Sequence, residues 1–445
     1  MKKNLTQGSV LKTLFSFSLP FLLSYFLQTL YGMADLFIVG QFNGVESTTA
    51  VSIGSQVMHM LTVMIVGLAM GSTVMIGRAI GAGKQDEAAS AVGNTVTLFM
   101  GLSLIVTVIL LLLVNPIVSV MSTPEEAVKG TTMYLTICFI GIPFITAYNI
   151  ISSIFRGMGD SKSPMYFIAV ACAANILLDY LFIGTLGLGA AGAALGTTLS
   201  QTISVFISLW VILKKQTGLS LSRHHFRPQK EILGSLLKVG LPVAFQDGFI
   251  QISFIVITVI ANLRGLNDAA AVGIVEKLIG FLFLVPSSML STVSALAAQN
   301  IGAGKHDRAR QTLRYAIIVC LSFGFCAVIV MQLKAEFFVG LFSSDADVIR
   351  MGGQYMHGYI WDCLLAGIHF CFSGYFCAYG LSGISFMHNS ISIVCARVPL
   401  AYLTSKYFTD TLFPMGLATV AGSTISSIIC IIVFIWMQKK NFQNT

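Results

Sequence analysis

An amide and a carboxylate stand four residues apart in a strongly apolar stretch of the chain. Asn175 and Asp179 lie within a run of mostly apolar residues from Pro164 to Leu186. In a helix, residues spaced by four lie on one face, one turn apart. A carboxylate at the middle of a membrane helix costs about 2.5–3.5 kcal/mol on insertion scales. Such a group is usually turned toward the protein interior and used to bind ions, protons or substrate.

The composition of the chain excludes a soluble protein. Of its 445 residues, 56% are hydrophobic and 10% are charged, and the mean hydropathy is +0.84. Soluble domains carry about 25% charged residues. The apolar runs are long enough to cross a bilayer, for which about 20 helical residues suffice. We therefore predict an all-α integral membrane protein with twelve transmembrane helices, over residues 14–39, 49–76, 91–114, 127–155, 164–186, 189–213, 237–262, 269–296, 311–333, 347–379, 384–405 and 412–437.

The basic residues indicate the orientation of the chain in the membrane. The formal net charge is +8, from 26 lysines and arginines against 18 acidic residues. If the N-terminus lies inside, most basic residues outside the spans, among them Lys2, Lys3, Lys215 and Lys440, fall on the inner side. The positive-inside rule then places both termini in the cytoplasm of a multi-pass plasma-membrane protein. The charge thus reflects topology rather than binding of nucleic acid.

The reactive residue types form no catalytic or metal-binding pattern. All nine cysteines fall inside predicted spans without paired spacing, so we interpret them as packing residues. No His, Cys or carboxylate group has metal-ligand spacing, and no serine stands in a nucleophile elbow. Residues 81–84 lack P-loop spacing, because Arg78 stands where the first glycine should be and Gln85 follows the lysine. We expect no enzyme activity, no cofactor and no nucleotide site.

The chain contains an internal repeat of half its length. Residues 80–88 (IGAGKQDEA) return as residues 301–309 (IGAGKHDRA), and Gly159 corresponds to Gly380. Six spans in each half are an even number, so both halves enter the membrane in the same direction. Parallel repeats of this kind form a binding site between them near the membrane midplane. We predict a six-helix lobe over 1–213, a cytosolic linker over 214–235, and a second six-helix lobe over 236–445, around a central cleft.

Two further features bear on movement and topology. Pro20 and Pro242 stand early in the first span of each half and are expected to bend those helices, since proline frees the carbonyl four residues back. Many membrane prolines are only structural, so a role in rocking stays open. The basic linker is expected to be partly helical along the inner membrane surface. There its positive charges keep the segment on the cytoplasmic side and attract anionic lipid.

Several motifs occur in an order that is specific in combination. They are ADLFIVG at 34–40, IGAGK at 80–84 with its copy at 301–305, RGMGD at 156–160, and NILLD at 175–179. With twelve spans in two parallel halves, the chain resembles the multidrug and toxic compound extrusion (MATE) transporters over about residues 10–438. The resemblance implies export of drugs, coupled to inward flow of H⁺ or Na⁺ through polar residues of the N-terminal lobe.

By position, the resemblance assigns a cation-coupling site to Asp35, Asn175, Asp179, Thr197 and Tyr134. Two carboxylates brought together repel, so the pair either takes up a proton or holds a cation such as Na⁺. The second half offers an internal comparison, because no carboxylate reappears at the counterparts of Asp35 and Asp179, whereas tyrosine and a hydroxyl residue do. Tyr134 and Thr197 could therefore belong to the scaffold.

A second set of residues is expected near the substrate cleft. The candidates are Phe245, Gln246, Asp247, Glu276, Met60 and Met64. Soft methionines suit a promiscuous site, yet methionines at helical spacing are more often packing residues. Glu276 either attracts a cationic substrate or pairs with Arg397 or Lys277. The acidic residue that some MATE members carry in span ten has no clean counterpart, since Asp362 lies too early.

These observations lead to one favoured function and two alternatives. We expect a monomeric antiporter that exports organic, cationic and amphipathic compounds in exchange for a cation, with H⁺ favoured over Na⁺. A flippase of a lipid-linked saccharide would need a strongly cationic cavity, but only Lys277 and Arg397 lie within spans. A membrane enzyme using His59, His369 or the carboxylates would cluster catalytic groups near one interface, and no such cluster is evident in the sequence.

Overall fold

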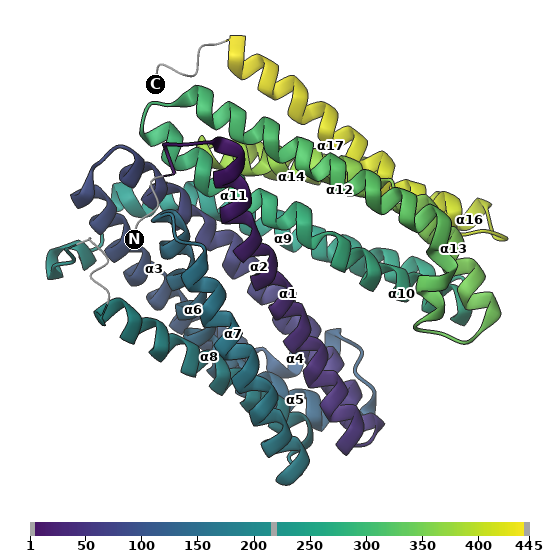
Figure 1. The fold of residues 1–445 in the computed structure, drawn as a ribbon. Helices are drawn as coiled ribbons and strands as arrows, with labels where there is room; N and C mark the ends of the chain where they lie inside the picture. Colours follow the sequence, from purple (N-terminus) through teal and green to yellow (C-terminus); the bar gives the residue numbers. More distant parts are fainter. Residues whose placement is uncertain (1–4, 215–219, 440–445) are drawn as a thin grey trace. The chain divides into compact units, whose positions relative to one another are not determined.

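The computed structural model describes residues 5–214 and 220–439, and all regular elements in these ranges are helices (Figure 1). The described residues divide into two compact units. The first unit comprises Leu19–Ala244, and the second comprises Leu5–Ser18 together with the described residues from Phe245 onward. The basic residues Lys2, Lys3, Lys215 and Lys440, used above for orientation, lie outside the described residues.

The helices follow in chain order through both units. The first unit contains most of α1 (Val10–Phe42), then α2 (Val45–Gly81), α3 (Gln85–Leu112), α4 (Val114–Val120), α5 (Glu125–Ile140), α6 (Ile142–Gly157), α7 (Lys162–Asp179), η1 (Tyr180–Thr185), α8 (Gly189–Lys214), η2 (Arg223–Phe226) and the first part of α9 (Lys230–Asn262). The second unit continues with α10 (Leu266–Leu282), α11 (Leu284–Gly302), α12 (His306–Gly340), α13 (Ala346–Tyr359), α14 (Asp362–Ala378), α15 (Ser382–Ser392), η3 (Ile393–Arg397), α16 (Val398–Tyr407) and α17 (Phe413–Lys439).

All twelve predicted spans coincide with helical segments. Within the described ranges, nine helical stretches are long and apolar enough to cross a membrane. Two further spans are pairs that bend between their halves, α5 with α6 by 50° and α13 with α14 by 44°. The remaining predicted span, 384–405, corresponds to α15, η3 and α16, in which a π-helix interrupts the α-helix. The chain is therefore an all-α multi-pass membrane protein with two six-helix repeats, as the sequence predicts.

Two of the breaks within spans occur at prolines. Pro143 has no N–H to donate to the carbonyl of Phe139, and the helix breaks between Ile140 and Ile142. In the same way, Pro286 has no N–H to donate to the carbonyl of Leu282, and α10 ends at Leu282. The position of each break is thus set by a nearby proline, while the apolar pattern of the span continues across the break.

The repeat is visible in the backbone as well as in the sequence. Gly83 has φ +73° and its counterpart Gly304 has φ +71°. After each turn the lysine N–H closes the loop onto the preceding helix, Lys84 to Ala79 at 3.0 Å and Lys305 to Asn300 at 2.8 Å. Left-handed glycines of this kind end helices at little cost. Both copies of the motif thus form a tight turn between two helices.

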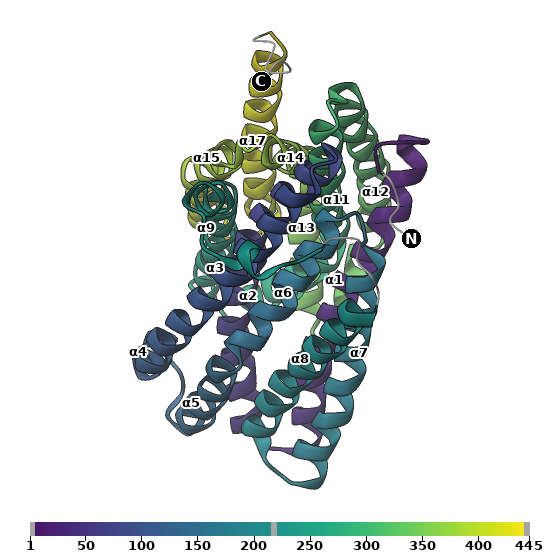
Figure 2. The same cartoon turned by 90° about the vertical axis from the view of Figure 1, so that its left-hand side faces the viewer.

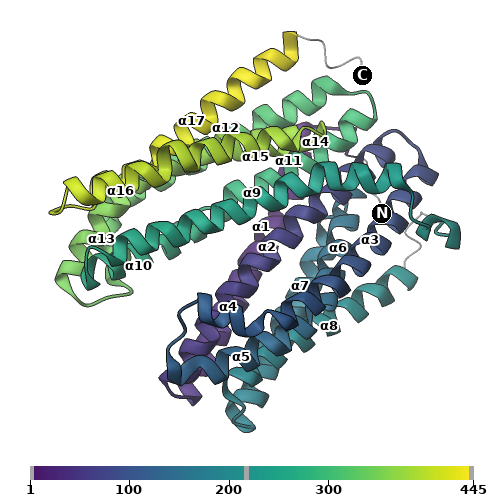
Figure 3. The same cartoon turned by 180° about the vertical axis from the view of Figure 1, so that it is seen from behind.

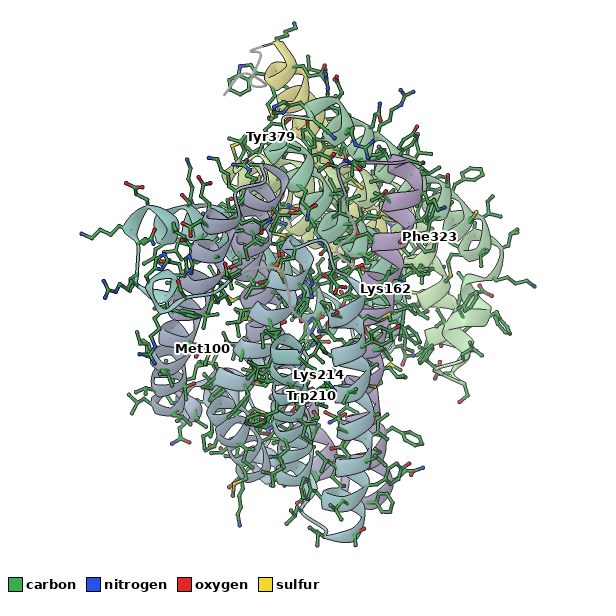
Figure 4. The ribbon with its side chains drawn as sticks, turned by 60° about the vertical axis from the view of Figure 1, so that its left-hand side comes forward. Met100, Lys162, Trp210, Lys214, Phe323 and Tyr379 are labelled. Carbon is green, nitrogen blue, oxygen red and sulfur yellow. The ribbon has the colours of Figure 1, made fainter. Side chains whose placement is uncertain are left out.

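Apolar side chains cover the outside of the helices, as expected for contact with lipid. On α3, Leu104, Ile105, Val108 and Leu112 are all more than half exposed. A contiguous face of this kind is uncommon on a soluble monomer. At the end of α8, the ammonium of Lys214 lies 4.6 Å over the ring of Trp210 (Figure 4). Aromatic and basic residues at helix ends are typical of the membrane interface.

The linker between the halves contains one short 3₁₀ turn, η2, which packs against α3. Asn94 donates to the carbonyl of His225 at 3.2 Å and accepts from the N–H of Gln229 at 2.7 Å, and Thr97 donates to the carbonyl of Phe226 at 2.8 Å. Gly93 makes this possible, because a Cβ at that position would clash with the carbonyl of His225. Among the described residues of the linker, η2 and the start of α9 are helical, in agreement with the predicted partly helical linker, and its placement at the membrane surface stays a prediction.

Candidate functional site

Asp35 and Thr197 form the best-defined contact of the candidate site. Asp35 lies on α1 and is 3% exposed. Thr197, on α8, donates its hydroxyl to Asp35 Oδ2 at 3.1 Å. The other carboxylate oxygen, Oδ1, has no hydrogen-bond partner although it is buried. One oxygen of this carboxylate is therefore bonded to Thr197, and the other is left without a donor.

Asp179 is the last α-helical residue of α7 and is fully buried. The chain then continues as the π-helix η1, a wider turn that is common at functional sites. The carboxyl group of Asp179 lies within hydrogen-bonding reach of that of Asp35. Two ionised carboxylates cannot bond to each other, and in that state both oxygens of Asp179 lack a donor. The structure thus brings the two acidic side chains together, and their role in cation coupling stays a prediction.

The helical hairpin of α7 and α8 holds this arrangement in place (Figure 2). On α7, Asn175 lies one turn before Asp179, as the spacing predicts, and it is also buried. Neither atom of its amide group makes a hydrogen bond of good geometry, although the amide lies within hydrogen-bonding reach of the Asp35 carboxylate. On α8, Gly196 faces both side chains: a Cβ there would overlap Asp179 Oδ1 and lie 3.6 Å from Asn175 Nδ2. The carboxylate of Asp179 fits at this place because Gly196 has no side chain.

Tyr134 lies beside this cluster rather than in its hydrogen-bond network. Its ring is buried against Gly54 of α2, where any Cβ would overlap it. Its phenol interacts electrostatically with Asp35. Tyr31 and Cys138 do so too, and neither was predicted from the sequence. Tyr31 precedes Asp35 by one helical turn, so the same spacing rule that selected Asn175 would have found it.

The site has a clear chemical requirement. In the ionised state, three buried oxygens of Asp35 and Asp179 lack donors, and like charges at close range cost free energy. Within the described residues, no basic side chain forms an ion pair with either carboxylate. A shared proton or a bound metal cation would remove both costs. The amide of Asn175 can donate to or accept from such a ligand shell.

The candidate cleft residues lie on three different helices. Met60 and Met64 are half-buried on α2, and Glu276, on α10, accepts a hydrogen bond from Thr258 at 3.3 Å. On α9, Gln246 is buried with an unpartnered carbonyl oxygen and Asp247 is half-buried. Phe245, also on α9, is half-exposed, and its ring centroid lies 6.4 Å from that of Phe386. Their contact with substrate stays a prediction.

The helices α1 and α9 continue through Pro20 and Pro242 without interruption. The two compact units nevertheless divide between Ser18 and Leu19 on α1 and between Ala244 and Phe245 on α9. Both divisions fall within two residues of a proline. The predicted bends at Pro20 and Pro242 stay predictions.

The fold also assembles a His and carboxylate group that the sequence spacing does not show. Asp86 on α3 lies next to His224 and His225 of η2. The ring of His225 uses both nitrogens, since Nε2 bonds to Asp86 Oδ1 at 3.0 Å and Nδ1 accepts the N–H of Ser222 at 3.0 Å. We interpret this group as a docking contact of the linker.

Comparison with known proteins follows the internal repeat. A family model described as MatE matches residues 20–181 and 242–403. The chain belongs to the MatE family. The two matched segments are equally long and start 222 residues apart, which confirms the two repeats. Members of the MATE family are transport proteins rather than enzymes.

Curated relatives of this MATE protein cover nearly its full length. It is 28% identical to the probable multidrug resistance protein YoeA of Bacillus subtilis (strain 168), over 98% of this chain and 96% of the relative. It is 29% identical to the probable multidrug resistance protein YpnP of the same organism, over 90% of each chain. The multidrug export protein MepA of Staphylococcus saprophyticus is 26% identical over 83% of this chain and 81% of the relative.

Solved structures share the fold. A crystal structure of MATE in complex with MaL6 is 25% identical, with a TM-score of 0.88, over 98% of this chain and 97% of that chain. An outward-facing MATE transporter of the MOP superfamily superposes with a TM-score of 0.90 at 24% identity, over 98% and 97% of the two chains. At 24% identity, the similarity to this outward-facing transporter shows the fold alone.

Proposed function

We propose that this MATE protein is a multidrug efflux transporter that exchanges organic, cationic, amphipathic compounds for inward-moving protons across the plasma membrane, with both termini in the cytoplasm. One observation carries the proposal. Asp35 and Asp179, from two different helices of the first unit, form a buried carboxyl pair with three unpartnered oxygens and no ion pair to a basic side chain among the described residues. The names of the relatives YoeA, YpnP and MepA support drugs as the exported cargo.

The geometry supports the following cycle. A proton that enters from outside is shared between Asp35 and Asp179 and removes their repulsion. Because the two residues belong to α1 and α7, the change in their interaction lets these helices repack against α8, through the contact of Asp35 with Thr197. Repacking alters the adjacent drug cavity and releases the drug outward. The proton leaves on the inner side when the site next opens there.

The energy available from one proton is sufficient for useful export. One elementary charge that moves through 100 mV gains about 2.3 kcal/mol. At room temperature this supports about a fifty-fold concentration gradient of drug for each net charge that moves inward per cycle. Exchange of one proton for one singly charged drug moves no net charge, so the pH gradient drives it instead, by about tenfold per pH unit. No nucleotide site is required.

The test is transport in vesicles reconstituted with purified protein. A fluorescent organic cation should move against its gradient when a pH gradient is imposed, and less when only a Na⁺ gradient is imposed. Asp35→Asn and Asp179→Asn should each abolish gradient-driven movement, since each removes one charge from the pair. The matched control is Glu126→Gln, which changes an exposed carboxylate at the start of α5. Wild-type rates in either Asp variant would refute the assignment, and a response to Na⁺ alone would replace H⁺ by Na⁺.

A further inference from the structure

The two copies of the repeated turn differ in a residue that changes what their basic side chains bind. Residues 80–88 read IGAGKQDEA, and residues 301–309 read IGAGKHDRA. In the first copy, Lys84 Nζ bonds to Glu87 Oε1 at 2.8 Å, and the two side chains are 60% and 61% exposed. In the second copy, Arg308 takes the place of Glu87, so the lysine of that copy lacks this carboxylate partner.

Both basic residues of the second copy bind the segment that precedes α1. Lys305 Nζ donates to the carbonyl of Thr6 at 2.8 Å, and Arg308 Nη1 donates to the carbonyl of Gly8 at 2.9 Å. Their turn joins α11 and α12, which lie side by side in the second unit (Figure 3). The start of α1, in dark purple, lies against this end of the two helices (Figure 1). We call Lys305 and Arg308 the N-terminal clamp.

Arg308 is oriented for this contact by a buried amide. Its Nε donates to Asn300 Oδ1 at 3.2 Å, and Asn300 is 1% exposed. The amide of Asn300 is fixed in turn, since its Nδ2 donates to the carbonyl of Leu296 at 2.8 Å. In the first copy, the counterpart of Asn300 is Ala79, which has no polar side chain. The first copy therefore lacks both the arginine and the amide that orients it.

The clamped segment is also held by apolar side chains. Leu5, Val10, Leu14 and Phe17 are all at most 7% exposed, and the last three lie on one face of α1. Phe15, on another face of the helix, is 51% exposed. Residues 5–18 belong to the second compact unit. Charge-assisted hydrogen bonds at the clamp and an apolar stripe along the helix thus fix this segment to the second unit.

Helix α1 connects the clamped segment to the candidate coupling site. It is one helix from Val10 to Phe42, of which the residues up to Ser18 belong to the second unit and the rest, with Asp35, to the first. From Ser18 to Asp35 the helix extends about 25 Å, at 1.5 Å per residue. If the N-terminal end is fixed, a displacement of α1 at Asp35 is transmitted to the second unit. If that end is loose, the helix shifts without moving the second unit.

We propose that Lys305 and Arg308 are positioning residues for α1, which hold its N-terminal end on the second unit so that proton exchange at Asp35 is converted into drug movement. The conversion rests on the proposed function, whereas the holding of residues 5–18 does not. A loosened clamp leaves the carboxyl pair intact. Proton and drug binding therefore persist in such a variant, and only their coupling to transport is lost.

The test reverses the difference between the two copies of the motif. Arg308→Glu gives the second copy the residue of the first, so that Lys305 bonds to the new carboxylate, as Lys84 does to Glu87, and releases the N-terminal segment. Because the first copy forms its turn with this residue, the turn should stay intact. The matched control is Glu87→Arg, the same exchange in the first copy. Arg308→Lys keeps a cationic donor and should behave as the wild type.

Release of the segment is measured first, by the rate at which a water-soluble maleimide modifies Thr6→Cys in purified full-length protein. Thr6 is 9% exposed, and the exposed Cys326 and Cys395 are replaced by serine in all variants. Loss of hydrogen bonds from charged donors should raise the rate in Arg308→Glu at least about tenfold. Glu87→Arg should label at the parent rate. Equal rates in Arg308→Glu and its parent would overturn the proposal, because the clamp would not hold the segment.

Coupling is measured second, with the fluorescent cation ethidium. Transport of ethidium into vesicles under a pH gradient should be largely lost in Arg308→Glu, because movement of α1 then opens the weakened clamp instead of shifting the second unit. Glu87→Arg should transport normally. Proton release on ethidium binding in detergent should persist in Arg308→Glu, whereas a misfolded first unit would lose it. Normal transport by Arg308→Glu together with fast labelling would overturn the positioning role.

These assays separate the inference from the proposed function. If the wild type moves ethidium with a Na⁺ gradient only, the coupling ion changes and the same comparison is made with Na⁺. A wild type that moves ethidium under neither gradient would refute the proposed function and the positioning role with it, while the labelling rates would still decide whether the clamp holds the segment. Should Arg308→Glu fail to fold, Lys305→Gln, with Lys84→Gln as its control, takes its place with the same expected results.

Discussion

Gly196 provides a direct way to disturb the candidate site without changing any charge. In Gly196→Ala, the added Cβ would lie 3.2 Å from Asp179 Cγ and overlap Oδ1. The carboxylate has to move by about 1 Å, and a displacement of this size at a reacting group costs about a hundredfold in rate. The clash is with the end of a flexible side chain rather than with backbone, so the helix itself can remain in place.

The substitution should therefore separate folding from transport. Alanine is favoured over glycine in a helix by about 1 kcal/mol, which offsets part of the strain. We expect a melting temperature within a few degrees of the wild type and a fall in proton-driven drug transport of about a hundredfold. The control is Gly101→Ala on α3, where a Cβ meets no atom within 4 Å, and transport should stay normal. Normal transport by Gly196→Ala would show that the position of Asp179 does not matter.

Three further predictions address the surroundings. Tyr134→Phe keeps the ring on Gly54 and should reduce transport less than about threefold, whereas Tyr134→Ala should lower stability by about 3–5 kcal/mol, as seen in melting curves. Asn94→Ala leaves the N–H of Gln229 without its acceptor at a cost of about 1–3 kcal/mol, so limited trypsin digestion after Arg223 should be faster; unchanged digestion would contradict the docking of η2 on α3. Gly83→Ala should destabilise the protein by about 1 kcal/mol, because φ at this residue is +73°, and equal melting temperatures would contradict that strain.

Much of the fold was predictable because its main signals are local. The apolar runs, the repeated IGAGK turn and the four-residue spacing of Asn175 and Asp179 depend only on neighbouring residues. The proximity of Asp35 to Asp179 required the family resemblance as well, since 143 intervening residues separate them in the sequence.

The parts that the sequence did not predict depend on tertiary contacts. Gly196 matters because a carboxylate from another helix approaches it, and the sequence of α8 alone contains several glycines. The π-helix η1 and the bend between α13 and α14 are not marked by proline at the break, whereas η3 ends two residues before Pro399. In the second half, Asp362 of α14 and Arg397 of η3 line one cavity, which their separation in the sequence does not show.

The most direct measurement of the central claim counts protons released when purified protein binds drug. In weakly buffered detergent solution, a pH indicator should report about one proton released per drug bound by the wild type at a pH where the carboxyl pair holds a proton. Asp35→Asn and Asp179→Asn should bind drug without this release, and Glu126→Gln should behave as the wild type. Proton release that persists in both Asp variants would contradict the account, because the exchangeable proton would then reside elsewhere.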